Sequence, residues 1–376
     1  MKLPRIFRRS YEPKTLGASN TDSRSATDDA RVIRDTLAEF DIEAKVLEAN
    51  VGHGVTSFLV QLAPGVNPDK IAKLDANLAL NLQATTLRVV PSLTDSSQVS
   101  IEVPNAKLVV ARLSDLFDQL ARAKKAMSKL EFIVGKDISG RIVTADLASL
   151  PHLMIAGQTG SGKSTMLNNI LANILPKNSP EDLQVILIDP KQAEFAPYEH
   201  IPHLQRPVIT EPSDWSDALS WVLQESERRL QLLASSTAAD IDEYRVKTGQ
   251  HLPHILVMSD EFSDMMMQGG DEVERIITSV AGSAAKTGIH FVVSTSRPSV
   301  DVYTDTLKAC FESRMIFTVA SRVDSKSMLG ESGAEKLNGR GDLLYRVFSE
   351  TQADRIQAAF VSDDEIQRLT KTLRGN

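Results

Sequence analysis

The sequence predicts an α/β protein in which a mainly parallel sheet, covered by helices, follows a smaller α/β module. Short apolar runs at 153–156, 185–188 and 255–258 alternate with longer segments of helical spacing, which is the order that parallel strands with crossover helices require. A glycine-rich turn at 157–164 joins the first run to a helical segment. The length of 376 residues exceeds the usual size of one domain, so two domains are expected.

Composition and charge are those of an ordinary globular protein, with 42% hydrophobic residues and a formal net charge of −7. This charge argues against a generally basic nucleic-acid coat, although an acidic protein can still contain a local basic channel. The single cysteine, Cys310, excludes an intrachain disulfide and is typical of a reducing cytosol. No apolar run reaches about 18 residues, so we expect a cytoplasmic chain that does not itself span a membrane.

The first third of the chain is expected to contain a basic flexible arm, residues 1–26, and a small α/β module, residues 27–105. The arm is either a plain disordered terminus or a segment that touches DNA or an acidic membrane surface. In the module, hydrophobic spacing predicts a helix capped by Asp28 or Asp29, a strand pair around a glycine turn, a second helix from Pro68, and two more strands. The strands are expected at 45–51, 55–62, 87–90 and 99–103.

The remaining chain is predicted as a connecting helix, residues 106–130, a larger domain, residues 131–350, and a C-terminal helical tail, residues 351–376. A hairpin is expected to lead into the glycine-rich turn, and buried strands and amphipathic helices then alternate. Besides the three apolar runs above, the expected elements are the hairpin strands 132–134 and 142–144, the strands 291–293 and 316–319, and the helices 215–233 and 273–286.

The glycine-rich turn fits the pattern G-x-x-x-x-G-K-[ST] at every fixed position. Its glycines let successive N–H groups point at phosphate oxygens, and the following helix N-terminus adds partial positive charge. Lys163 would reach the β and γ phosphates of ATP, and the Ser164 hydroxyl would ligate Mg²⁺. A turn that binds nothing is the alternative, which the complete motif disfavours. The candidate nucleotide-binding residues are Gly157, Gln158, Thr159, Gly160, Ser161, Gly162, Lys163, Ser164 and Thr165.

Two adjacent carboxylates, Asp260 and Glu261, follow the apolar run 255–258. Ligands of open α/β sheets bind at the carboxyl ends of strands. Asp260 is therefore suited to hold Mg²⁺ together with Ser164, and Glu261 to orient and polarise the water that attacks the γ phosphate. Alone, such a pair is often a solvated strand end. Because it follows a complete phosphate loop by about a hundred residues, we interpret it as part of a hydrolysis site.

Further motifs occur in order along the chain, at residues 152–164, 188–191, 198–204, 227–229, 260–264, 288–290 and 297–302, and are extended by 135–140, 334–335 and 341–345. Together they resemble the motor of the FtsK/SpoIIIE DNA translocases. Residues 63–66 and 101–105 resemble the smaller module that precedes that motor. The resemblance implies a RecA-like P-loop ATPase motor and a ring, usually a hexamer, that encloses duplex DNA and couples ATP hydrolysis to its movement.

The resemblance also implies roles for single residues. Arg297 and Lys308 fall on positions that contact DNA in the channel, and Arg322 falls where the family has a lysine that reaches a nucleotide phosphate. Two positions depart from the family: Ala285 replaces an arginine that reaches the neighbouring subunit's site, and Ser296 replaces a glutamine. A trans arginine supplies ~10³ or more in rate in related chemistry, so slow hydrolysis or a rearranged interface is expected.

The function predicted from these observations is ATP-driven translocation of double-stranded DNA by a homo-oligomeric ring, with Lys163, Asp260, Glu261 and Arg322 in the hydrolysis site. Two alternatives stay open: a protein-secretion ATPase of the same motor type, and an ATP-binding subunit with little turnover. About thirty residues follow Tyr345, too few for the winged-helix DNA-reading domain common in the family, so the sequence leaves sequence-directed orientation and septal anchoring open.

Overall fold

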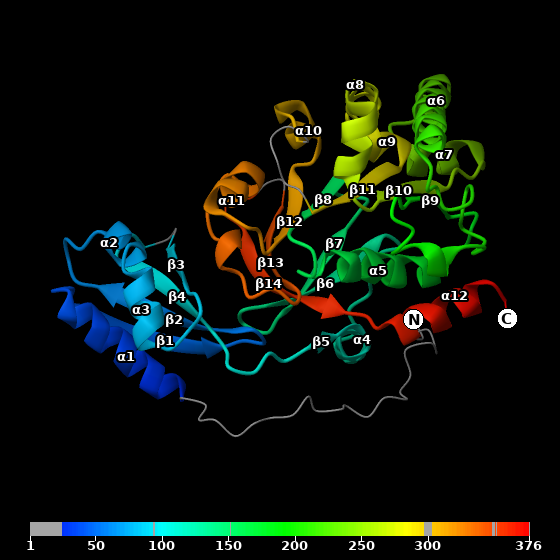
Figure 1. Ribbon diagram of the computed structural model, residues 1–376. Helices are drawn as coiled ribbons and strands as arrows, with labels where there is room; N and C mark the ends of the chain where they lie inside the picture. Colours follow the sequence, from blue (N-terminus) through cyan, green and yellow to red (C-terminus); the bar gives the residue numbers. More distant parts are fainter. Residues whose placement is uncertain are drawn as a thin grey trace.

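The computed structural model describes residues 25–92, 95–150, 152–296, 303–347, 350 and 352–375. The described residues form two sheets: a four-stranded sheet near the N-terminus and a ten-stranded sheet that carries the rest of the chain (Figure 1). None of the helices in these ranges combines the length and the apolar character needed to cross a membrane.

The smaller sheet has the strand order β1-β2-β4-β3, and all its neighbours are antiparallel. Its strands are β1 (Ala44–Val51), β2 (Val55–Leu62), β3 (Arg88–Pro91) and β4 (Gln98–Pro104). Three helices pack with it: α1 (Ala26–Glu39), α2 (Pro68–Ala72) and α3 (Asp75–Asn81). The expected element order is therefore present, but the helix predicted from Pro68 is divided in two, because the chain leaves helical hydrogen bonding between Ala72 and Asp75.

The cap of α1 differs from the prediction. Ser25 is the N-cap, and its hydroxyl accepts a hydrogen bond from the N–H of Asp28. The Asp28 side chain bonds back to the Ser25 backbone, which completes a capping box. The prediction of Asp28 or Asp29 as the cap itself is therefore wrong, because Asp28 is the third residue inside the helix.

The larger sheet has the order β7-β6-β14-β13-β12-β8-β11-β10-β9, and β5 pairs with β14 beside this path. The run from β9 to β12 is parallel, and the run from β12 to β7 is antiparallel. The strands are β5 (Ala111–Arg112), β6 (Glu131–Asp137), β7 (Ile142–Asp146), β8 (His152–Ala156), β9 (Leu183–Ile188), β10 (His254–Ser259), β11 (Ile289–Thr295), β12 (Ser313–Phe317), β13 (Asp342–Arg346) and β14 (Asp354–Phe360).

Helices cover both faces of this sheet, as the apolar runs predicted. In β8, Leu153 and Ile155 belong to one core while Met154 and Ala156 belong to the other, because successive side chains of a strand point to opposite faces. The first core contains residues of α4 (Leu113–Arg122), α5 (Lys163–Ile174) and α12 (Asp363–Leu373). The second contains residues of α6 (Pro212–Ser236), α8 (Phe262–Ala281), α10 (Asp305–Cys310) and α11 (Arg322–Leu329). Smaller helices are α7 (Ile241–Thr248) and α9 (Ala284–Thr287).

Three further predicted segments differ from the structure. The helix predicted at 273–286 is divided between α8, which begins earlier and ends at Ala281, and the short α9. In 106–130 the chain forms β5 and the shorter helix α4 instead of one long connecting helix. In 351–376 a helix is present, but it follows strand β14, which pairs with β13 and β6 inside the large sheet. The prediction missed this strand because Arg355 and Gln357 interrupt its apolar pattern, although both side chains are buried.

Candidate active site

The glycine-rich turn leaves the carboxyl end of β8 and enters α5. Gly157, Gly160 and Gly162 have φ values of 154°, 79° and 123°, which favour glycine. A Cβ on Gly157 would lie 2.7 Å from Cβ of Phe317, and a Cβ on Gly162 would lie 3.0 Å from the backbone nitrogen of Gly341. Gly157 and Gly162 are therefore required by close packing as well as by conformation.

The turn is fastened to three neighbouring segments. The Gly157 N–H donates to the carbonyl of Thr295 at 3.2 Å, at the end of β11, and the Gln158 N–H donates to the carbonyl of Thr318 at 2.7 Å, just beyond β12. The N–H of Gly341, before β13, donates to the carbonyl of Ser161 at 2.8 Å. These bonds hold the rim of the turn, while Gln158, Thr159 and Gly160 remain exposed to solvent.

Lys163 is the first residue of α5 and is buried, with 6% of its surface exposed. Its ammonium donates to the carbonyl of Gln158 at 3.1 Å. Burial lowers the pKa of Lys163, and the negative charges of Glu261 and Asp260 oppose that shift. The structure thus brings the lysine and the acidic pair together, as the two motifs predicted. Ser164 and Thr165 follow in the first turn of α5 and are half-buried.

Asp260 follows β10 and is 6% exposed. Burial raises the pKa of its carboxyl group to about 6, and the charges of Glu261, Glu194 and Asp189 add to the shift, while the Ser294 hydroxyl opposes it. A carboxylate in this setting gains from a nearby cation, because a cation relieves both the desolvation and the repulsion. The environment of Asp260 therefore suits a metal ligand.

Glu261 is held by both of its carboxylate oxygens. Ser296 donates its hydroxyl to Oε2 at 2.7 Å, and the Lys191 ammonium lies 3.2 Å from Oε1. Burial alone would raise the pKa of Glu261, but the bonds from Ser296 and Lys191 outweigh it and lower the pKa. The residue has a φ of 49° and is the N-cap of α8, a left-handed conformation that is uncommon for a non-glycine residue.

Sequence reasoning missed the roles of three residues in this site. Ser296 stands out in the sequence only as a departure from the family, yet it is a direct partner of Glu261. Lys191 lies in a motif to which the sequence assigns no role. Glu194 reaches the site because the buried Asp189 carboxylate accepts the N–H groups of Glu194 and Phe195 at 2.8 and 2.9 Å, which folds this loop back. The motif at 188–191 was the available signal.

The other predicted site residues that the structure describes take part in none of these contacts. Arg322 begins α11 and is exposed, four residues beyond the carbonyl of Thr318 that holds the turn. Lys308 lies in α10, where its side chain is 18% exposed and its ammonium is 3.3 Å from a carboxylate oxygen of Asp305. Arg297 lies outside the described residues. Ala285 is exposed on α9.

Known families match two consecutive parts of the chain. The model of the FtsK alpha domain matches residues 10–105, and the model of the FtsK/SpoIIIE family matches residues 112–300. The chain is 41% identical over 348 residues to DNA translocase FtsK of Caldanaerobacter subterraneus subsp. tengcongensis, which covers 92% of the chain and 49% of the relative. It is 41% identical over 344 residues to DNA translocase SftA of Bacillus subtilis, covering 90% of the chain and 36% of the relative. The chain thus spans half the length of these curated relatives or less.

Solved structures share the fold at lower identity. The monomer form of the pCW3 conjugation coupling protein TcpA with ATPγS has a TM-score of 0.65 at 22% identity, covering 92% of the chain and 99% of that protein. The cytoplasmic domain of the type VII secretion ATPase EccC of Thermomonospora curvata has a TM-score of 0.57 at 22% identity, covering 66% and 31%. These likenesses confirm the predicted fold, a P-loop α/β domain after a small α/β module. The family models and the sequence relatives show that the chain belongs to the FtsK/SpoIIIE family.

Proposed function

We propose that this chain is an ATP-driven double-stranded DNA translocase that works as a homo-oligomeric ring. The observation that carries the proposal is the convergence of a complete phosphate loop, Asp260 and Glu261 in a chain that is 41% identical to two proteins named DNA translocases. Because the chain spans only part of those proteins, the activity is inferred for this chain from its own site.

In this site the phosphate loop binds the triphosphate of ATP. Lys163 exchanges its bond to the Gln158 carbonyl for the β and γ phosphates, which is favourable because the buried ammonium then faces charged oxygens. Ser164 and the ionised Asp260 would hold Mg²⁺, which would supply positive charge against the negative charge of the triphosphate. The raised pKa of Asp260 fits this role, since burial and acidic neighbours make its negative charge costly until a cation binds.

Glu261 orients and polarises the attacking water. Its two partners keep the carboxylate ionised and prevent it from rotating away, which supports a positioned base or water-orienting group. From the sequence alone, Ser296 argues against efficient hydrolysis, because the family has glutamine at this position. Its hydrogen bond to Glu261 supports a competent site instead.

The grip on DNA is assigned to Arg297 and Lys308, as sequence-independent phosphate contacts. Lys308 would exchange Asp305 for a DNA phosphate. Arg322, exposed at the first position of α11, is assigned to a nucleotide phosphate. Since Ala285 supplies no side-chain charge to a neighbouring subunit, turnover is expected to be slower than with a trans arginine.

The proposal is tested by the ATPase rate with and without long linear duplex DNA, measured alongside mass in solution with ATP. We expect duplex DNA to stimulate hydrolysis, Lys163→Ala to abolish it, and Lys371→Ala, an exposed lysine on α12, to leave it unchanged. Hydrolysis indifferent to DNA, with recovery of secreted proteins in a pull-down, would favour the secretion ATPase. Tight ATP binding with background turnover in assembled rings would favour the subunit with little turnover.

A further inference from the structure

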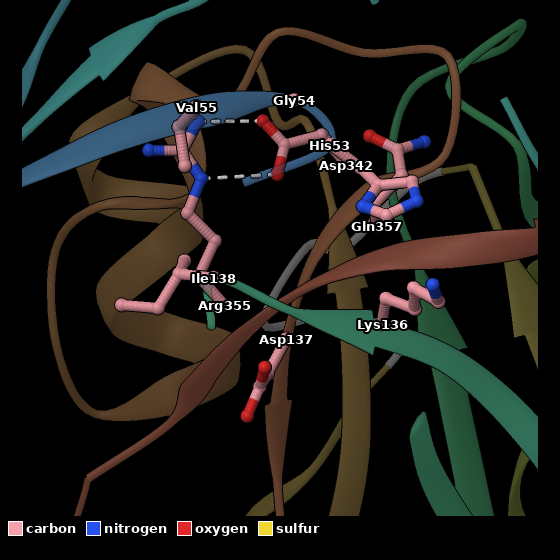
Figure 2. A pocket seen from close by; sticks show the side chains of 9 residues that line it. All are labelled: His53, Gly54, Val55, Lys136, Asp137, Ile138, Asp342, Arg355 and Gln357. Atoms are coloured by element: carbon pink, nitrogen blue, oxygen red, sulfur yellow. Dashed lines mark hydrogen bonds and ion pairs between the residues drawn. The ribbon is translucent and has the colours of Figure 1, made fainter. Parts of the chain in front are cut away.

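Four buried charges join the small module to the large sheet. Arg355 of β14 donates from Nη1 to Oε2 of Glu102 in β4 at 2.8 Å, and from Nε and Nη2 to the two carboxylate oxygens of Asp342 in β13 at 3.0 and 2.6 Å. Arg88 of β3 lies 3.6 Å from the other oxygen of Glu102. All four residues are buried, with at most 5% of their surface exposed. Figure 2 shows the guanidinium of Arg355 bonded to the Asp342 carboxylate beside His53 and Gln357.

The arrangement is poorly explained as a source of stability. Two positive and two negative groups balance, but removing four charges from water costs about as much as their attraction returns. Apolar residues of similar volume would hold two packed surfaces at least as well. What the ion pairs add is a defined orientation between the two sheets. The planar guanidinium donates in fixed directions, and its two carboxylate partners belong to different sheets.

Asp342 is directly preceded in the chain by the residue that holds the phosphate loop. The Gly341 N–H donates to the Ser161 carbonyl at 2.8 Å, and its backbone nitrogen is where a Cβ on Gly162 would collide. A rotation of the backbone at Asp342 would therefore shift the Gly341 N–H that binds the phosphate loop. Asp342, which binds Arg355, and Gly341, which binds the phosphate loop, are therefore adjacent in the chain.

Strand β14 also binds the two residues that directly precede Asp342. The Ala358 N–H donates to the Gly341 carbonyl at 2.7 Å, and the Gln357 side chain donates to the Arg340 carbonyl at 2.9 Å. Arg355 thus lies on the strand that binds Arg340 and Gly341, and its side chain binds the next residue, Asp342. The contact path runs from Glu102 through Arg355 and Asp342 to Gly341 and the phosphate loop.

We propose that Arg355 is a positioning residue through which docking of the small module sets the geometry of the phosphate loop, so that ATP affinity depends on the Glu102 contact. This rests on the proposed function only in requiring that the loop binds ATP. The small module, to which we assign no residue of the nucleotide site itself, becomes an input to it.

The test is the affinity of the full chain for a fluorescent ATP analogue with Mg²⁺. Glu102→Gln keeps the shape of the side chain and an acceptor for Arg355 but removes the charge between the two sheets. We expect it to raise the dissociation constant about fivefold or more, and Arg355→Lys to do the same, because an ammonium cannot bond both carboxylates in the same geometry. Asp75→Asn is the control, since Asp75 pairs with Lys336 across the same two parts of the chain in an ion pair that includes neither Asp342 nor Arg355.

Melting temperature, measured on the same samples, separates positioning from simple destabilisation. Weakened binding by Glu102→Gln, with unchanged binding by Asp75→Asn, supports the path. If Glu102→Gln lowers the melting temperature but binds the analogue like the unaltered chain, the network is only structural and the inference is overturned. Equal weakening by both variants would also overturn it, because docking in general would then be the cause. Failure of the unaltered chain to bind any nucleotide would instead contradict the proposed function.

Discussion

Replacing Asp260 by asparagine should stabilise the protein while it destroys magnesium-dependent hydrolysis. Burial holds the pKa of this carboxyl group at about 6, against an ordinary value of 3.8. At any pH between these two pKa values, the folded protein therefore binds a proton at Asp260 more readily than the unfolded chain does. Stability conferred by the neutral acid is present at low pH and is lost as the pH rises toward 6.

The size of the effect follows from that difference. A change from 3.8 to about 6 corresponds to about 3 kcal/mol of unfolding free energy that the ionised carboxylate costs well above pH 6. The amide of the substituted side chain carries no charge at any of these pH values, so Asp260→Asn should gain up to about 3 kcal/mol at pH 8 without Mg²⁺. The gain should shrink as the pH falls through 6 and become small near pH 4, where both chains carry a neutral group.

Urea unfolding in EDTA between pH 4 and 8 measures this directly, and Asp271→Asn is the control because it removes an exposed carboxylate from α8, the helix that follows the acidic pair. Added Mg²⁺ and ATP should stabilise the unaltered protein and not the Asp260→Asn variant. A variant that is no more stable than the unaltered protein at pH 8, or whose advantage does not depend on pH, would refute the reasoning.

Three further predictions concern the same site. Ser296→Ala should lower the turnover number about tenfold while leaving ATP affinity unchanged, because it frees one oxygen of Glu261; steady-state kinetics should also show that Ser296→Thr, which retains the hydroxyl, keeps most of the activity. Gly162→Ala should lose nucleotide binding and about 1 to 3 kcal/mol of stability, owing to its φ of 123° and its contact with Gly341; Gly282→Ala, with open space around it, should change neither quantity in titration and unfolding assays. Ala285→Arg should raise DNA-stimulated turnover in assembled rings if a missing trans arginine limits the rate, and an increase equalled by Lys286→Arg would argue that a guanidinium anywhere at this surface, and not one at position 285, is responsible.

Local patterns made much of this site predictable. The phosphate loop has its fixed residues within one turn, and the acidic pair directly follows one buried strand, so spacing alone predicted both. The alternation of apolar runs and helical segments likewise predicted the parallel half of the sheet, since each strand buried on both faces is a continuous apolar run. The partners of Glu261 were not predictable in this way, because Lys191 and Ser296 come from loops that follow two different strands.

The sequence by itself determined the phosphate cradle, the acidic pair and the α/β class, because each depends on residues near one another in the chain. Only the tertiary structure decided that β14 enters the large sheet and that Arg355 joins Glu102 to Asp342. Glu102 and Arg355 are 253 positions apart. From the sequence alone a charged residue in a strand is expected to face solvent, because its buried partners are known only from the packed structure. The physical reason is that a buried charge is stable only where several distant segments meet around it.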